Sequence, residues 1–237
     1  MGGTANTASG FASSVTGGYG NKATNQRSAV VGGRDNTASG FAAFVGGGGA
    51  DQLPNSTIYV GGNVAAGNFS SVVGGHASEA LGHFTHVAGG SDNTGAGDFA
   101  AVGGGSANFV GSGTTFGTIA GGHMNLANGT GSFVGGGGAD AATGLGGNDA
   151  TGSYSAVVGG SDNTASAEYS LIGGGSGNKA NTSHATVVGG LDNFAMGPYS
   201  TVAGGHTNSA VGYGAYVGGG GGMGSWPLIV MGPNVAR

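Results

Sequence analysis

The sequence predicts an all-β repeat solenoid: a stack of about fifteen short coils, each about fifteen residues long. Three observations support this fold class. Glycine makes up 61 of the 237 residues, far more than in an average globular domain. One set of residue types recurs every fifteen positions through almost the whole chain. Within each copy, residues alternate with the period of two that β-strands require.

The composition excludes several other classes of protein. Collagen needs Gly at every third position and much Pro, whereas the Gly spacing here is irregular and there are four Pro. With 38% hydrophobic residues and a net charge of −5, the chain does not match a disordered protein. Five Lys and Arg residues are too few for nucleic-acid binding. There is no Cys for disulfides or thiolate metal sites, and Gly interrupts every apolar run, so we expect no membrane insertion.

The repeat is clearest in the second half of the chain. Asn163, Asn178, Asn193 and Asn208 are fifteen residues apart, and Ala follows each of them two positions later. The consensus of one copy is N-x-A-x-G-x-Y-S-x-V-x-G-G-x-x. The Asn column continues at Asn6, Asn21, Asn36, Asn63, Ser78, Asn93 and Asn148. Agreement in many columns over nearly the whole chain indicates a true repeat and not merely an abundance of Gly.

Each copy predicts two short strands. After Asn163, residues 164–169 alternate in character, and residues 170–174 alternate again after a change of face. Gly pairs fit the corners because Gly adopts positive φ angles without strain. The Asp-Asn pairs at 162–163 and 192–193 fit turns through side-chain bonds to the local backbone. Each coil is then expected to hydrogen-bond to the coils on either side of it.

Three segments depart from the register and predict loops that project from the stack. Residues 51–62 hold a shortened copy with Leu53-Pro54-Asn55. The copy that begins at Asn108 departs in length by about two residues, at 113–116. Residues 137–147 form a degenerate stretch.

The small interior residues predict association between chains. The columns that face inward hold Ala, Gly, Ser and one Val or Ile per copy, so each coil is narrow. Ordering the backbone of such a coil costs more free energy than burial of one Val and one ring returns. Packing apolar columns against other copies of the chain offsets this cost, and we expect a homotrimer.

The copies N-x-A-x-G-x-Y-S-x-V-x-G-G resemble the head repeats of trimeric autotransporter adhesins, the YadA-like heads, and the β-roll segments of bacteriophage tail fibres. The resemblance covers roughly residues 4–220 and is best at 148–160 and 193–205. It implies a left-handed parallel β-roll that forms homotrimers. The period of fifteen differs from the family's usual period of about fourteen, so we expect corners of a different shape.

The resemblance implies a non-enzymatic virion protein of a bacteriophage: a tail fibre, a spike or a capsid-decorating knob. An autotransporter has a signal peptide, a heptad stalk and a membrane barrel, and these patterns do not occur in the sequence. The head of a bacterial surface adhesin, located at the cell surface, is the alternative. An ice-binding solenoid fits less well because its Thr columns would be regular, whereas Thr164, Lys179, Phe194 and Ser209 share one column.

We divide the chain into a β-roll repeat domain, residues 1–222, and a C-terminal cap or docking segment, residues 223–237. The latter contains the only Trp and the most apolar run. Its candidate cap or docking residues are Trp226, Leu228, Ile229, Val230 and Met231. Candidate contacts to a host receptor or glycan lie in the projecting loops, at Gln52, Asn55, Tyr59, Thr114, Thr115 and Phe116. The other expected partners are further copies of the chain and other virion proteins.

Other conspicuous residues favour structural roles. His76, His123 and His206 share one polar corner column, where we expect no metal site. The Asp-rich corners lack the nine-residue period of calcium-binding β-rolls. A column of rings predicts packing between chains, with sugar or receptor contact as the alternative; it contains Phe69, Phe84, Phe99, Tyr154, Tyr169 and Tyr199. No phosphate-loop or nucleophile motif accompanies the Gly runs, and we predict no enzymatic activity and no cofactor.

Overall fold

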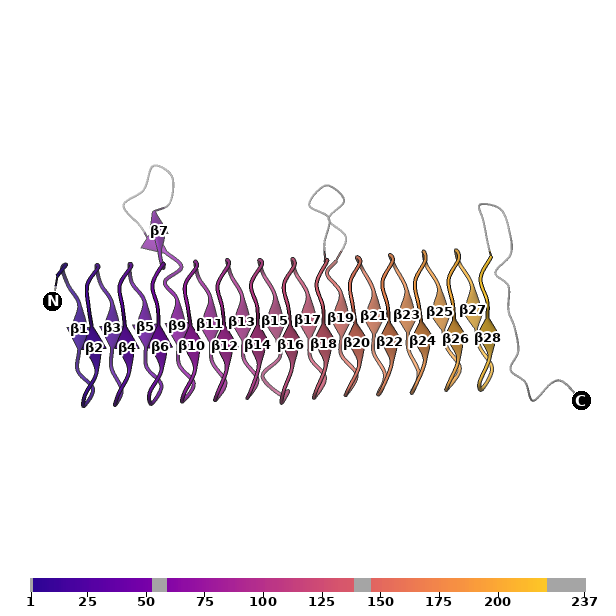
Figure 1. Cartoon of the computed structure of the whole chain (residues 1–237), viewed down its shortest axis with the longest axis horizontal. Helices are drawn as coiled ribbons and strands as arrows, with labels where there is room; N and C mark the ends of the chain where they lie inside the picture. The colour runs from indigo at the N-terminus through magenta and orange to yellow at the C-terminus, as the bar shows by residue number, and fades with distance from the viewer. Residues whose placement is uncertain (1, 53–58, 139–145, 221–237) are drawn as a thin grey trace, which may run out of the picture. The chain divides into compact units, whose positions relative to one another are not determined.

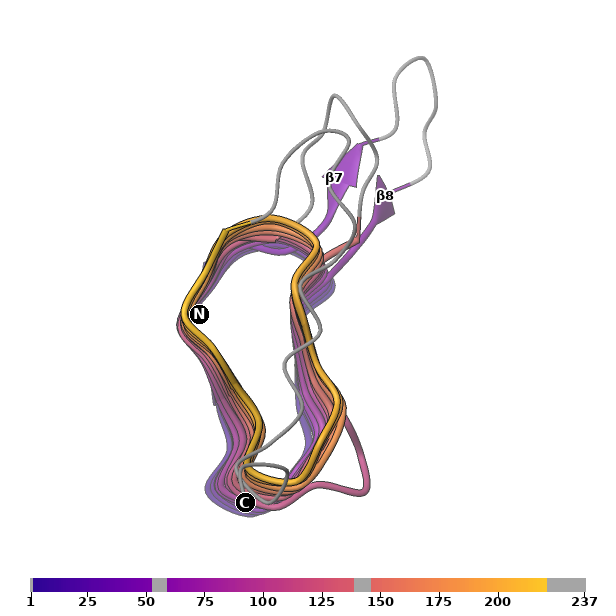
Figure 2. The same ribbon diagram turned by 90° about the vertical axis from the view of Figure 1, so that its right-hand side faces the viewer.

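The computed structural model describes residues 2–52, 59–138 and 146–220, and within these ranges the chain is all-β without a helix. It forms a parallel β-solenoid of about thirteen turns. The chain divides into two compact units, residues 1–116 (unit 1) and residues 117–237 (unit 2). Figure 1 shows the coils stacked within each unit, and Figure 2 shows that each coil is a flattened ring with two long sides. Within the described ranges, no helix could span a membrane.

Every coil contributes one two-residue strand to each of two parallel sheets. In unit 1 the first sheet contains β1 (Thr7–Ala8), β3 (Lys22–Ala23), β5 (Thr37–Ala38), β9 (Val64–Ala65), β11 (Glu79–Ala80), β13 (Thr94–Gly95) and β15 (Phe109–Val110). The second sheet contains β2 (Ser14–Val15), β4 (Ala29–Val30), β6 (Phe44–Val45), β10 (Ser71–Val72), β12 (His86–Val87) and β14 (Ala101–Val102). The two strands of one coil thus lie on opposite sides of the ring.

Unit 2 repeats this arrangement. Its first sheet contains β17 (Leu126–Ala127), β19 (Asp149–Ala150), β21 (Thr164–Ala165), β23 (Lys179–Ala180), β25 (Phe194–Ala195) and β27 (Ser209–Ala210). Its second sheet contains β16 (Thr118–Ile119), β18 (Phe133–Val134), β20 (Ala156–Val157), β22 (Leu171–Ile172), β24 (Thr186–Val187), β26 (Thr201–Val202) and β28 (Tyr216–Val217). The fifteen-residue period sets the register, so that Ala165 pairs with Ala180 and Ile172 with Val187.

The shortened copy at residues 51–62 forms no coil, whereas the prediction that this segment projects from the stack is confirmed (Figure 1). Thr37 of β5 pairs directly with Val64 of β9, so the intervening segment adds no coil to the stack. Instead β7 (Asp51–Gln52) and β8 (Tyr59–Val60) pair antiparallel and project from a corner of unit 1 (Figures 1 and 2). An antiparallel pair needs only a short connection, whereas a further coil needs a full circuit of the ring. This hairpin is one reason why there are fewer turns than the expected fifteen.

The other two departures from the register lie at corners. Asp98 pairs with Thr115, which makes that coil two residues longer than the repeat and confirms the expected insertion. Leu126 of β17 pairs with Asp149 of β19, so an extra segment lies between these strands. Residues 139–145 of that segment are outside the described ranges.

The interior is narrow and filled by four columns. The second residue of nearly every strand faces inward and is fully buried, as Ala in the first sheet and Val or Ile in the second. A column of Ser, Thr or Ala lies directly before most strands of the second sheet, as at Ser170 and Ala185. The remaining column is Asn. Asn178 is fully buried, accepts a hydrogen bond at Oδ1 from Asn193 N and donates from Nδ2 to Gly174 O and Gly190 O. Because one Asn serves two neighbouring coils, the column fixes their register as well as filling space.

Gly is required at one corner of the ring. Gly190 has φ +99°, and a Cβ there would overlap Gly205 O of the next coil. The neighbouring Gly189 does not share this constraint, since the nearest atom to its Cβ would be Gly174 O at 3.7 Å. The Gly pairs of the repeat therefore contain one Gly that the fold requires and one that it tolerates.

Candidate functional site

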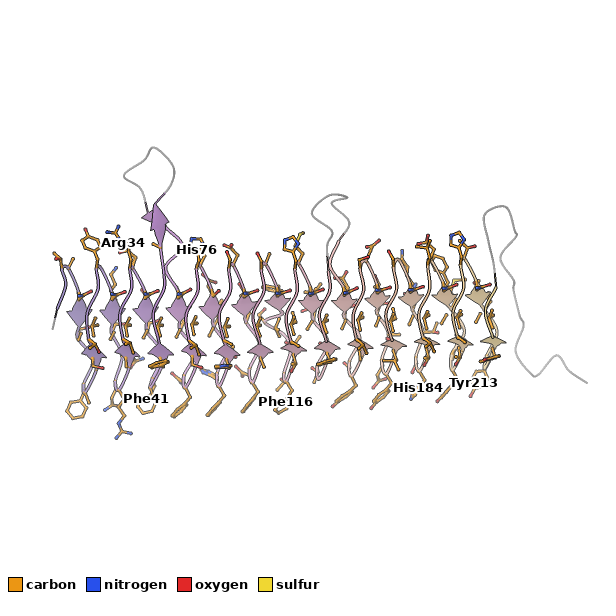
Figure 3. The ribbon with its side chains drawn as sticks, turned by 45° about the horizontal axis from the view of Figure 1, so that its top comes forward. Arg34, Phe41, His76, Phe116, His184 and Tyr213 are labelled. Atoms are coloured by element: carbon orange, nitrogen blue, oxygen red, sulfur yellow. The ribbon has the colours of Figure 1, made fainter. Side chains whose placement is uncertain are left out.

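An exposed ladder of phenylalanine rings follows one edge of unit 1. Phe69, Phe84, Phe99 and Phe116 stack in order, with ring centroids 4.9 to 5.0 Å apart. Phe41 packs edge-on against Phe69 at 5.3 Å. Between 45% and 59% of each stacked ring's residue surface stays exposed. Figure 3 shows Phe41 and Phe116 on this edge, with Arg34 and His76 at the opposite edge of the unit.

Unit 2 has a ladder at the equivalent corner, but it is built from Tyr and His. Tyr154 stacks on Tyr169 at 5.3 Å, and His184 lies between Tyr169 and Tyr199 at 4.9 and 4.6 Å. Tyr213 ends the series, tilted against Tyr199. Figure 3 labels His184 and Tyr213 on this ladder. The rings contact one another within the chain, which gives the aromatic column a role that the sequence did not predict.

The ladder residues adopt left-handed backbone conformations. The φ angles are 55° to 63° for the four stacked Phe residues, and 56° to 59° for Tyr154, Tyr169, His184 and Tyr199. Gly131 and Gly214 hold the same corner in other coils, where the conformation is free of strain. A bulky residue with positive φ is uncommon and costs on the order of 1–2 kcal/mol. Ala12, Arg27 and Ala42 hold the same corner with φ angles of 53° to 59°, so the left-handed conformation belongs to this corner of the coil whichever residue occupies it.

A row of polar side chains runs beside the Phe ladder, one residue before each ring. Asn68 Oδ1 accepts a hydrogen bond from Phe41 N at 3.0 Å, and His83 Nδ1 accepts one from Asn68 N at 3.1 Å. Asp98 Oδ1 accepts one from His83 N at 2.7 Å. We call Asn68, His83 and Asp98 the anchored row, because each side chain is held by the backbone of the preceding coil.

The Tyr ladder lacks such a row. The equivalent residues in unit 2 are Ser153, Glu168, Ser183 and Pro198. Within the described parts of the chain, the one side-chain contact in this set is between Ser183 Oγ and His184 Nδ1, at 2.7 Å. Similar ring ladders thus have different polar neighbours in the two units.

The outer face of the second sheet carries no formal charge. In each unit this neutral face consists of the first residue of every even-numbered strand other than β8 and the residue after that strand, and none of these is Asp, Glu, Lys or Arg. Leu171, Val158 and Val188 on this face are 40%, 53% and 56% exposed. The outer face of the first sheet differs, since it carries charged residues such as Glu79 and Lys179.

Within the described ranges, the histidine and aspartate columns do not gather into a metal site. His76 Nδ1 lies 3.4 Å from Ser91 Oγ, and His86 Nδ1 lies 2.7 Å from Ser71 Oγ. Among the described residues, no three His, Asp or Glu side chains are grouped to hold a metal ion. Asp149 has a raised pKa, because burial disfavours its charged form and Asp162 adds negative charge nearby.

The loop residues predicted to contact a host receptor or glycan lie in different environments. Gln52 and Tyr59 lie in the β7–β8 hairpin, and Asn55 lies outside the described residues. Thr114 is buried, and its Oγ1 donates to Gly111 O within the turn. Thr115 is half-buried, and Phe116 belongs to the Phe ladder rather than to a projecting loop.

The predicted cap or docking residues lie outside the described residues, as does the predicted boundary between residues 222 and 223; they are Trp226, Leu228, Ile229, Val230 and Met231. The anchored row is not evident from the sequence alone. In the sequence, a polar residue directly precedes each stacked ring of unit 1. This pattern indicates a row of side chains only after the structure shows that the rings are stacked.

No protein-family model matches the chain, and no curated protein is detectably similar to it in sequence. The features of the described residues that bear on function are the two ladders, the anchored row and the neutral face.

Proposed function

We propose that the chain is a non-enzymatic structural and attachment protein of a bacteriophage virion, as part of a tail fibre, spike or capsid-decorating knob. In this proposal three chains form a trimer of left-handed β-rolls, held together along the neutral face. The observation that carries the proposal is that an exposed, partly apolar sheet face has no charged residue in any described coil.

Large exposed apolar patches mark surfaces that bind another protein. The centre of a protein interface is depleted in charged residues, as the neutral face is. Its rows repeat at the strand separation of about 4.8 Å, and a second copy of the chain has the same spacing along its whole length. Another solenoid of identical period is therefore the partner whose side chains match it in every coil.

The interior supports a structural role. Buried Asn, Ala, Val and Ile side chains occupy it in coil after coil, and the Asn side chains are committed to hydrogen bonds between coils. Functional contacts must therefore come from the outer surface, as in a protein that displays binding sites. The partners in this proposal are further copies of the chain, other virion proteins and a host surface receptor or glycan.

The test is the mass of the purified protein in solution, measured by light scattering after gel filtration. The proposal predicts three times the chain mass of 22.0 kDa, unchanged on dilution. Val188→Lys should reduce this mass because it introduces a charge into the neutral face. Val211→Lys is the matched control, since Val211 is 43% exposed on the side of the first sheet. A well-folded monomer of the wild-type chain would refute the trimer.

A further inference from the structure

We infer that the anchored row and the Phe ladder beside it form a binding strip for a neutral, linear polysaccharide. The strip consists of Asn68, His83 and Asp98 together with Phe69, Phe84 and Phe99. This inference deepens the proposed attachment function, on which it rests, by naming the class of host ligand and the residues that hold it.

The polar side chains of the strip are fixed before a ligand arrives. Each uses one atom to accept a hydrogen bond from the backbone of the preceding coil: Oδ1 of Asn68, Nδ1 of His83 and Oδ1 of Asp98. The chain of three contacts locks the side chains at one-coil intervals. Preorganised groups lose less conformational entropy on binding, so each contact to a ligand retains more of its free energy.

The second polar atom of each side chain remains available for a ligand. Because His83 Nδ1 accepts a hydrogen bond, the proton of the neutral ring is on Nε2, which is then a donor. Asn68 Nδ2 is also a donor, and Asp98 Oδ2 is an acceptor. None of these three atoms has a hydrogen-bond partner within the described residues. Asn68 and His83 are exposed, and Asp98 is half-buried.

The rings form the apolar wall of the strip. The rings are nearly parallel with centroids 4.9 to 5.0 Å apart, and between 45% and 51% of the surface of Phe69, Phe84 and Phe99 stays exposed. The row of donors and acceptors therefore runs beside a ridge of aromatic carbon at the same one-coil spacing.

This combination matches the chemistry of sugars. Sugar hydroxyls both donate and accept hydrogen bonds, whereas the C–H faces of the ring are apolar. A neutral polymer fits better than an anionic one, because Asp98 would repel negative charge. Contacts that recur once per coil favour a linear ligand, since the coil spacing of about 4.8 Å is comparable to the length of one sugar residue.

Affinity electrophoresis of the full-length protein tests the inference. Native gels would contain dextran, galactomannan or mixed-linkage β-glucan as neutral probes, and polygalacturonate as an anionic probe. We expect at least one neutral polysaccharide to retard the wild-type protein, and polygalacturonate to leave its mobility unchanged. Failure of all three neutral probes, or retardation by polygalacturonate alone, would overturn the inference.

Two isosteric variants test whether the strip itself is responsible. Asp98→Asn and Asn68→Asp both retain the anchoring Oδ1 but change the outward atom, from acceptor to donor and from donor to acceptor. We expect each variant to weaken retardation by about tenfold, with an unchanged circular dichroism spectrum. Glu168→Gln is the matched control, because it changes the same column in unit 2 and should bind like the wild type.

Equal binding by all variants would place any polysaccharide contact elsewhere on the chain and refute the strip. The outcome is separable from the test of the proposed function. A monomeric mass with normal retardation would refute the trimer but support the binding strip. A trimeric mass without retardation would support the trimer but refute the binding strip.

Discussion

The two aromatic ladders show how one backbone supports different surfaces. Both ladders place a ring at the same left-handed corner, and both stack their rings at about the coil spacing. Unit 1 uses Phe beside a row of side chains that are anchored on the backbone. Unit 2 uses Tyr and His, whose outer rim is polar, beside residues without that anchoring. The difference indicates that the repeat determines the backbone of both units, whereas the outward-facing residues give each unit a different surface.

If the scaffold is the same in both units, equivalent Gly substitutions should have equal effects. Gly190→Ala in unit 2 and Gly75→Ala in unit 1 should each cost more than about 3 kcal/mol, because both positions have positive φ and a Cβ would overlap a carbonyl oxygen. The free energy of unfolding in urea, at one protein concentration, measures the loss. Gly189→Ala and Gly74→Ala are the controls and should change it by less than about 0.5 kcal/mol. A large loss in one unit alone would show that the corners differ.

The Asn column should also contribute equally in the two units. Asn178→Ala removes the acceptor for Asn193 N and leaves Gly carbonyls without their donor, and Asn36→Ala does the same in unit 1. We expect each variant to lose about 3 kcal/mol, since buried polar groups lose their partners. Urea unfolding of the two variants gives the comparison. Values that differ by more than about 1 kcal/mol would mean that the column does not act alike in the two units.

Ring stacking and backbone strain can be separated at Phe84. Phe84→Ala removes two stacking contacts but keeps a Cβ at φ +56°, so it should lose about 1–3 kcal/mol. Phe84→Gly removes the same contacts and relieves the strain, so it should be more stable than the Ala variant by about 1 kcal/mol. Tyr169→Ala and Tyr169→Gly provide the same pair in unit 2. Thermal unfolding gives the order, and a less stable Gly variant would contradict the strain argument.

Ser78 interrupts the Asn column of unit 1, whereas the column of unit 2 continues from Asn148 to Asn208 without a break. Ser78 N donates to Asn63 Oδ1, but its short side chain bonds to His76 O instead of reaching the next coil. Ser78→Asn should restore the missing links and raise the unfolding free energy by about 1 kcal/mol. Denaturation in urea would detect the gain. A loss would mean that the cavity at this coil is too small for Asn.

The smallest expected effect concerns Asp149, whose raised pKa follows from burial and from Asp162. A raised pKa means that the folded state binds this proton more tightly than the unfolded state does. The contribution of Asp149 to stability therefore falls as the pH rises above about 3.8, the ordinary value for Asp. Asp149→Asn should be slightly more stable than the wild type at pH 7, with no gain at pH 3. Thermal midpoints at the two pH values test this, and a gain only at low pH would contradict it.

Much of the fold follows from the repeat, while the candidate site does not. The fifteen-residue spacing of Asn163, Asn178 and Asn193 predicts parallel pairing in that register, and the structure confirms it. The anchored row escapes sequence analysis because its hydrogen bonds join residues fifteen positions apart, as between His83 and Asp98. No local pattern marks such a contact until the two coils are placed side by side.

The sequence by itself determined the two-strand coil, its period and the buried columns of Ala, Ser and Val or Ile, but not the burial of the Asn column. It did so because alternation, Gly spacing and the Asn column act over short distances and repeat in every copy. The tertiary structure alone decided that residues 51–52 and 59–60 pair as a hairpin, and that the rings stack along one edge. Both features depend on which segments of the chain become neighbours in space. The hairpin forms because antiparallel pairing competes with another turn of the coil. The ladders form because the rings of successive coils come into contact.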